Sequence, residues 1–198
     1  MKKILLIGSG GHAKSIIDIL ETNSEWNIFG LVGLENEVGK KILDFPIIWN
    51  DNDLPALRKK VKYTFLSIGQ IGLSCKRKNM TDYLKKLNYN FPVLRSKFSI
   101  VSKYSSIDEG TLICHDVVIN SNTKIGKQCI INTKSLIEHD VVIEDFCHIS
   151  TGVIINGGAS IGEGSFIGSG SIIREGVVIP PHTVISAGKR IMGWPIKY

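Results

Sequence analysis

The chain has 198 residues, of which 43% are hydrophobic and 21% are charged, and its formal net charge is +6. These values are ordinary for a globular protein of one or two domains. The basic residues are dispersed and no aromatic or recognition-helix signature accompanies them, so nucleic-acid binding is not expected, although the charge suits an anionic ligand that carries phosphates.

The N-terminal half begins with the pattern of a nucleotide-binding α/β unit. Residues 4–7 are a short aliphatic strand, residues 8–13 a glycine-rich turn, and residues 14–20 carry apolar side chains at helical spacing. We predict further strands at 28–34 and 63–68, a basic helix at 75–87, and a linker from Pro92 to Ser99. The whole is a small Rossmann-like domain, residues 1–92, that binds a nucleotide or a sugar.

The glycine-rich turn supplies the candidate substrate ligands of this domain. Glycines let the backbone approach a ligand, and the helix that follows offers free N–H groups to anionic oxygens. The Gly-x-Gly-x-x-Ala pattern alone is a weak signal for a dinucleotide, and one mononucleotide half can hold one nucleotide. An acidic residue that binds a ribose is expected some 20 residues on, and Glu35 stands at a loosely compatible place. The alternative is that the glycines only form a tight turn.

The C-terminal half has a strict six-residue repeat. Every sixth residue from Ile107 to Ile191 is isoleucine, and the fourth residue after each one, from Thr111 to Thr183, is small or β-branched. Residues two apart in a strand share a face, so both positions point inward. We predict a left-handed parallel β-helix of hexapeptide type, residues 93–198, with about five coils from Val101 to Ile191. A β-sandwich would instead need turns 8–12 residues apart.

The corners of these coils are expected to carry glycines with positive φ angles. The candidates are Gly126, Gly158, Gly162, Gly164, Gly168, Gly170 and Gly176. Flat six-residue faces give a three-sided prism, and three prisms packed side by side close a ring, so we also predict a homotrimer.

Several features favour a cytoplasmic protein. No segment is long enough to span a membrane, and the apolar run at residues 4–7 is too short for a signal peptide. The four cysteines, at 75, 114, 129 and 147, show no close pairing pattern, and Cys129 and Cys147 occupy the small inward position. We therefore expect reduced cysteines.

Three stretches together resemble a known family. They are Gly-Ser-Gly-Gly-His at residues 8–12, the segment from Ile130 to Asp140, and Cys-His-Ile-Ser at residues 147–150. They are similar to the sugar O- and N-acyltransferases of the sialic-acid and bacillosamine type, which acetylate sialic acids or nucleotide-linked 4-amino sugars. The resemblance covers essentially the whole chain and implies acetyl-CoA as co-substrate, no metal, and a homotrimer.

His139 is the strongest catalytic candidate. It follows an inward isoleucine by two residues and therefore projects from a corner, between Glu138 and Asp140, which can orient and stabilise a charged imidazole. A histidine suits the removal of a proton from an amine or hydroxyl that attacks a thioester. The resemblance implies that His139 is the general base and that Asp140 is its partner.

The resemblance also implies the ligand contacts. The sugar substrate lies near Gly8, Ser9, Gly10, Gly11, His12 and Glu35, and acetyl-CoA runs between neighbouring β-helices past His148, Gly157, Ser169 and Ala187. His148 is expected on an outward strand face, bonded to the thioester carbonyl, and the alternative is an interface histidine without a catalytic role.

Four functions remain open from the sequence. Many relatives that use nucleotide sugars carry adjacent aspartates after the second strand, whereas residues 32–37 here read Val-Gly-Leu-Glu-Asn-Glu. N-acetylation of a nucleotide-linked amino sugar is favoured, and O-acetylation of a sialic-acid-like sugar is the alternative. A non-catalytic nucleotide-sugar-binding trimer is a third reading. A zinc hydratase on the same β-helix is the fourth, but it needs three converging histidines, which the spacings do not provide.

Overall fold

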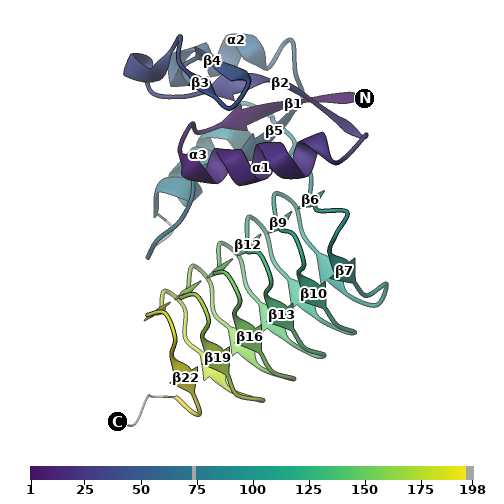
Figure 1. The fold of residues 1–198 in the computed structure, drawn as a ribbon. Helices are drawn as coiled ribbons and strands as arrows, with labels where there is room; N and C mark the ends of the chain where they lie inside the picture. Colours follow the sequence, from purple (N-terminus) through teal and green to yellow (C-terminus); the bar gives the residue numbers. More distant parts are fainter. Residues whose placement is uncertain (73–74, 195–198) are drawn as a thin grey trace. The chain divides into compact units, whose positions relative to one another are not determined.

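The computed structural model describes residues 1–72 and 75–194, which form two compact units (Figure 1). The first unit comprises residues 1–69 and 75–92. The second comprises the residues from Val93 onwards together with the short segment that begins at Gln70. No helix of the described residues is long and apolar enough to cross a membrane.

The first unit is a five-stranded sheet in the order β3-β4-β2-β1-β5, in which only β3 runs antiparallel to its neighbour. Its elements are β1 (Lys2–Ile7), α1 (Gly11–Glu21), β2 (Trp26–Val32), η1 (Glu35–Glu37), β3 (Lys41–Ile42), β4 (Phe45–Trp49), η2 (Asp51–Asp53), α2 (Leu54–Leu57), β5 (Tyr63–Leu66) and α3 (Cys75–Lys86). The predicted strand–turn–helix is present, but α1 begins at Gly11 and not at residue 14. The β3–β4 hairpin was not predicted.

Both faces of this sheet are buried. Leu5 and Ile7 on β1 pack in a cluster with Leu54, Leu57 and Leu84, which come from α2 and α3. The alternate residues Ile4 and Leu6 are also fully buried, and α1 lies along one face of the sheet (Figure 1). A continuous apolar run such as residues 4–7 is what a parallel strand covered on both faces requires.

The second unit is the predicted left-handed parallel β-helix. Its two-residue strands are β6 (Leu94–Arg95), β7 (Ile100–Val101), β8 (Ser106–Ile107), β9 (Leu112–Ile113), β10 (Val118–Ile119), β11 (Lys124–Ile125), β12 (Ile130–Ile131), β13 (Leu136–Ile137), β14 (Val142–Ile143), β15 (His148–Ile149), β16 (Ile154–Ile155), β17 (Ser160–Ile161), β18 (Phe166–Ile167), β19 (Ile172–Ile173), β20 (Val178–Ile179), β21 (Val184–Ile185) and β22 (Arg190–Ile191). Each strand pairs with the one 18 residues further on, which builds three parallel sheets.

The β-helix begins earlier than the isoleucine repeat indicates. Leu94 pairs with Leu112 and Arg95 with Ile113, so the first coil starts at Leu94. The predicted start at Val101 and the linker up to Ser99 were therefore wrong. The repeat does not reveal this coil because Arg95 stands at the isoleucine position, where its side chain is exposed and donates to Ser99.

The core confirms the six-residue pattern. The isoleucines from Ile113 to Ile191 are at most 2% exposed, and the small residues four positions later, from Thr111 to Ser171, are at most 1% exposed. Cys129 and Cys147 occupy two of these small positions, and the hydrogen bond with Cys129, followed by burial, raises the pKa of the Cys147 thiol. The coil interior is thus a column of isoleucines with a column of small side chains beside each corner.

The φ angles observed at the corners show that the prediction for the corner glycines was only partly right. The third residue after each isoleucine has a positive φ angle throughout, at Gly110, Asp116, Asn122, Gln128, Lys134, Asp140, Phe146, Gly152, Gly158, Gly164, Gly170, Gly176, His182 and Gly188. Gly126, Gly162 and Gly168 lie instead directly after an isoleucine. A Cβ atom at Gly162 would come within 2.4 Å of the Pro181 nitrogen, so this glycine is required because adjacent coils approach closely.

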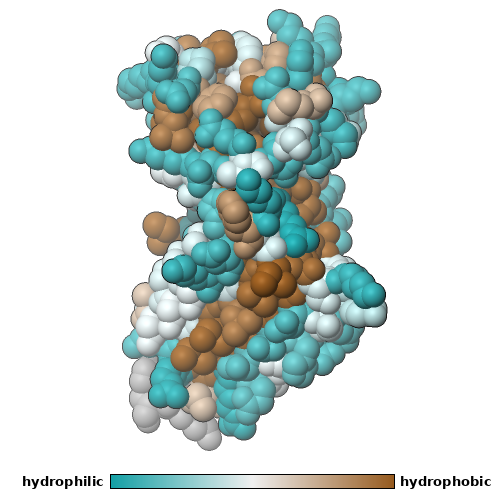
Figure 2. Space-filling view, turned by 45° about the vertical axis from the view of Figure 1, so that its right-hand side comes forward, coloured by the Kyte–Doolittle hydropathy of each residue, from teal (hydrophilic) through white to brown (hydrophobic). Residues whose placement is uncertain are grey.

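One face of the β-helix carries an apolar band. The outward residues of the sheet that contains β13 are aliphatic in five consecutive coils, and we call them the aliphatic stripe: Ile100, Val118, Leu136, Ile154 and Ile172. Figure 2 shows this band across the lower half of the molecule. Ile100 is 67% exposed, and the other four are partly buried. A contiguous exposed apolar band of this kind marks an interaction surface.

Candidate active site

The predicted base and its partner are in contact. His139 and Asp140 follow β13 at a corner, and His139 Nδ1 lies 2.7 Å from Asp140 Oδ2. Their side chains are 65% and 53% exposed, so both can be reached by a ligand. A carboxylate can only accept a hydrogen bond, so the shared proton is on Nδ1. The neutral imidazole then carries its lone pair on Nε2, which is the atom that can accept a proton.

Asn122, one coil earlier, holds the other oxygen of the Asp140 carboxylate. Its side-chain Nδ2 donates to Asp140 Oδ1 at 2.6 Å. The Asn122 amide, and after it His139, hold the pKa of Asp140 below its usual range, because both donate hydrogen bonds to the charged form. Asp140 is therefore an anion at neutral pH, with each oxygen held by a different side chain.

Gly157, one coil later, lies against the imidazole of His139. A Cβ atom built on Gly157 would be 2.7 Å from Cε1 and 2.9 Å from Nε2 of that ring. No real Cβ contact is so short, so the ring needs a residue without a side chain at this position. Gly157 was predicted only as an acetyl-CoA contact, and its place beside the base is new.

His148 lies on the outward face of β15 and is nevertheless buried. It is 7% exposed, and its Nδ1 lies 2.5 Å from the Gln70 carbonyl oxygen. The Phe166 ring packs edge-on against it at 5.2 Å. A carbonyl oxygen is an acceptor, so Nδ1 carries the proton. A hydrogen bond from Nε2 to a thioester carbonyl would therefore require the imidazolium form.

The glycine turn of the first unit is tied to η1. Ser9 Oγ donates to Glu37 Oε2 at 2.5 Å, and the Leu34 N–H donates to the same oxygen at 2.9 Å. These two donors lower the pKa of Glu37. Glu37, and not the predicted Glu35, is thus the acid that reaches the turn, and Glu35 lies exposed at the start of η1.

The remaining residues of the turn are more open to a ligand. Gly10 and Gly11 are exposed at the start of α1, with open space where a side chain would be, and His12 lies in the first turn of the helix, half-buried. A cavity of about 380 Å³ lies beside α3, lined by Ile68, Lys76, Asn79, Met80 and Tyr83. Of these lining residues, Ile68 also lies beside Gly8, where a Cβ atom would meet the Ile68 side chain at 2.8 Å.

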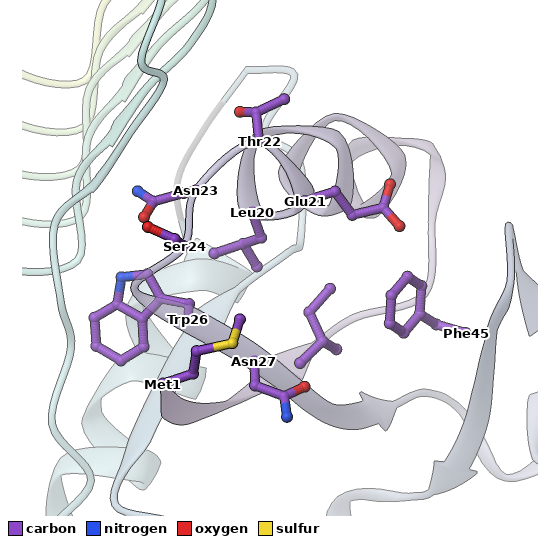
Figure 3. Close-up of a pocket in the computed structure, with 10 residues that line it drawn as sticks. Met1, Leu20, Glu21, Thr22, Asn23, Ser24, Trp26, Asn27 and Phe45 are labelled. Atoms are coloured by element: carbon purple, nitrogen blue, oxygen red, sulfur yellow. The ribbon is translucent and has the colours of Figure 1, made fainter.

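A second cavity lies away from the glycine turn. It has a volume of about 330 Å³ and is formed at the C-terminal end of α1 and the start of β2 (Figure 3), with the lining residues Met1, Leu20, Glu21, Thr22, Asn23, Ser24, Trp26, Asn27, Ile28 and Phe45. Because α1 begins at the turn and ends at this cavity, the two sites are separated by the length of the helix. None of the predicted site residues lines it.

Among residues 1–72 and 75–194, no three histidine, cysteine or acidic side chains gather in a way that could hold a metal ion.

Comparison with known proteins adds to this geometry. Residues 3–84 match the PglD N-terminal domain family. No curated protein matches the chain. A mutant of perosamine N-acetyltransferase from Caulobacter crescentus, solved with CoA and GDP-perosamine, is 27% identical with a TM-score of 0.90, and the match covers 98% of this chain and 90% of that one. The acetyltransferase domain of PglB from Neisseria gonorrhoeae, with acetyl coenzyme A, is 25% identical with a TM-score of 0.85, covering 96% and 92%.

Over nearly its whole length the chain is therefore similar to acetyltransferases of known structure. WeeI from Acinetobacter baumannii, at 21% identity and a TM-score of 0.62 over 100% of this chain and 99% of that one, shares the fold.

The predicted acetyl-CoA residues fall on two edges of one β-helix. Gly157 shares an edge with His139, in the corners that follow β13 and β16. Ser169 and Ala187 lie in the corners that follow β18 and β21, in the sheet that contains His148. There the Ser150 and Ser169 hydroxyls are 2.8 Å apart.

Two residues of the candidate site, Asn122 and Gln70, were missed by the sequence analysis, and Gly157 was predicted only as an acetyl-CoA contact. Asn122 and Gly157 stand 17 residues before and 18 residues after His139, so the coil length places both next to the dyad. The 18-residue length of a coil could therefore have identified Asn122 and Gly157 from the sequence. Gln70 is different, because it lies outside the repeat, 78 residues from His148, and no pattern in the sequence connects the two.

Proposed function

We propose that this chain is an acetyl-CoA-dependent N-acetyltransferase that acetylates the amino group of a nucleotide-linked amino sugar. The observation that carries the proposal is the exposed His139–Asp140 pair, with Nε2 of the imidazole available as a proton acceptor. Relatives of 25–27% identity over nearly the whole chain include an N-acetyltransferase solved with CoA and GDP-perosamine and an acetyltransferase domain solved with acetyl coenzyme A.

The residues account for every proton in this reaction. The sugar amine attacks the thioester carbonyl carbon, the C–N bond forms, and His139 Nε2 takes a proton from the nitrogen. Asp140, already an anion, stabilises the imidazolium that results. When the C–S bond breaks, the imidazolium returns the proton to the departing sulfur. The pair is thus the base for the first step and the acid for the second.

The substrate positions follow from the two units separately. Acetyl-CoA lies along the β-helix past His148, Gly157, Ser169 and Ala187. The sugar nucleotide binds to the glycine turn at residues 8–12, where the exposed start of α1 offers N–H groups to phosphates. Glu37 replaces Glu35 in this proposal, because its carboxylate adjoins Ser9.

The functional unit in this proposal is a homotrimer. Its support is the aliphatic stripe, which lies in the sheet whose corners carry His139 and Gly157. A subunit packed on this stripe would bring one of its own edges beside the base. That arrangement would place Ser169 and Ala187 of one chain near Gly157 of another, which a single β-helix does not do.

A charge in the stripe should break this assembly. Leu136→Glu places a carboxylate in the middle of the stripe, where association would bury it at a cost of several kcal/mol. We expect the wild type to have the mass of three chains by light scattering and the variant to be monomeric. Val178→Glu is the matched control, because Val178 is an exposed aliphatic residue of a different sheet. A monomeric wild type would refute the trimer.

The acceptor is tested with a panel of sugars. Purified protein is incubated with acetyl-CoA and UDP-, GDP-, dTDP- or CMP-linked amino sugars, and with a sialic acid. We expect release of free CoA with at least one nucleotide-linked amino sugar and an amide-linked acetyl group in the product by mass spectrometry. Turnover of the sialic acid alone would establish the O-acetyltransferase alternative. Binding of a nucleotide sugar without CoA release would establish the non-catalytic one.

A further inference from the structure

The carboxylate of Asp140 is held from two coils at once. His139 Nδ1 donates to one oxygen and Asn122 Nδ2 donates to the other, at 2.7 and 2.6 Å. Asp140 is a corner residue with a φ angle of 61°, and its side chain is about half exposed. An exposed carboxylate bonded only to its neighbour in sequence would sample several rotamers. The second bond removes that freedom.

The neighbouring pair Asn120 and Glu138 makes a similar contact between two coils but does not involve the imidazole. Asn120 Nδ2 donates to Glu138 Oε2 at 2.9 Å, again from one coil to the next on the same edge. That pair links the coils as Asn122 and Asp140 do, but the structure gives Glu138 no bond to the imidazole, whereas Asp140 has one. The coils are also joined at this corner by a backbone bond from the Asp140 N–H to the Ser121 carbonyl. Coil stacking alone therefore does not require the Asn122 amide.

We propose that Asn122 is a positioning residue for the acetyl transfer, which acts on His139 through the Asp140 carboxylate. The inference rests on the proposed function only for its kinetic consequences. Asn122 fixes the carboxylate, the carboxylate fixes the Nδ1–H tautomer and the plane of the ring, and Gly157 of the next coil bounds the ring on its other side. Residues from three successive coils thus position the imidazole of His139.

The kinetic test uses Asn122→Gly. Asn122 has a φ angle of 60°, and glycine adopts this conformation without strain, as it does at seven other corners of the β-helix. Loss of an outer partner of a catalytic group usually costs about 10–100-fold. We expect kcat to fall about tenfold, with unchanged KM values for acetyl-CoA and for the sugar. Asn120→Ala, which breaks the neighbouring pair, should keep the wild-type kcat.

A double-mutant cycle separates positioning from a general effect on the fold. Asp140→Gly removes the carboxylate without corner strain. If Asn122 acts only through Asp140, Asn122→Gly should cause no further loss of kcat in the Asp140→Gly background. A loss of the same size in both backgrounds would overturn the proposal, and so would a wild-type kcat in the Asn122→Gly single variant.

A readout without substrate keeps this inference distinct from the proposed function. Histidine-selective ¹⁵N spectra report which ring nitrogen carries the proton. We expect His139 to be the Nδ1–H tautomer in the wild type and in Asn120→Ala, and a mixture of both tautomers in Asn122→Gly. If the protein fails to acetylate any sugar but this shift is seen, the positioning role stands and the proposed function fails. An unchanged tautomer in Asn122→Gly refutes the positioning role.

Discussion

His139→Ala should lower kcat by about two to four orders of magnitude, which is the usual contribution of a general base. The variant loses the Nε2 lone pair that takes the proton from the attacking amine. The fold should be unaffected, because the His139 side chain is 65% exposed. Steady-state rates with acetyl-CoA and the best sugar of the panel, together with the thermal unfolding midpoint, measure both effects.

His115→Ala is the matched control for this variant. His115 stands at the equivalent corner position of another edge, after β9, where its Nδ1 contacts the Ser96 hydroxyl at 2.6 Å. It lies away from Asp140 in sequence and in sheet, so its loss should leave kcat near the wild-type value. If His139→Ala keeps most of its activity while remaining folded, another residue is the base. A loss near tenfold would indicate that the acceptor amine is already partly deprotonated and that His139 mainly orients it.

Gly157→Val is expected to reduce kcat by about 100-fold. Even the Cβ atom of the new residue would lie 2.7 Å from His139 Cε1, so the imidazole must move away. A displacement of about 1 Å in an aligned active site can cost this much in rate. Stability should change little, because the exposed ring can swing into solvent. Gly157→Ala should give a smaller loss in the same direction, since its side chain is shorter.

The two roles of Gly157 give different kinetics. If the glycine serves only acetyl-CoA, its replacement should raise the KM for acetyl-CoA more than the KM for the sugar and leave kcat unchanged. The contact with the base instead predicts a fall in kcat at saturating concentrations of both substrates. Glu175→Val is the control, because Glu175 stands at the same corner position one coil further on, where its partner is Arg174. An unchanged kcat in Gly157→Val would show that the ring position is not critical.

The fold was predictable to the extent that it repeats. The isoleucine period gives the coil length, the inward faces and the corner that carries His139, and the structure agrees from Ile113 to Ile191. The coil that begins at Leu94 is the first of the β-helix, and Arg95 fills its isoleucine position. The isoleucine repeat therefore does not extend into this coil, and the coil was missed. The β3–β4 hairpin was missed because β3 has only two residues and leaves no periodic signal.

The site was predictable where its parts are adjacent in sequence. His139 and Asp140 are neighbours, so a motif could locate them. Asn122 and Gly157, in the coils before and after, could be found only by counting the 18 residues of one coil along the chain. The burial of His148 could not be predicted, because its partner Gln70 lies 78 residues away in sequence. Likewise Glu35 and Glu37 differ by two positions, and only the turn geometry decides which one contacts Ser9.

The stacking of the coils also determines where unfolding of the β-helix begins. In a solenoid each coil is stabilised only by the coils next to it, so unfolding begins at the ends and moves inward. His139 has more than two coils on each side, from Leu94 in one direction and to Ile191 in the other. Fraying of either terminus therefore leaves the backbone amides around the dyad protected, and slow hydrogen exchange should be centred on β13 and β16. The coil that carries His139 and Asp140 is thus also the one most protected from thermal unfolding.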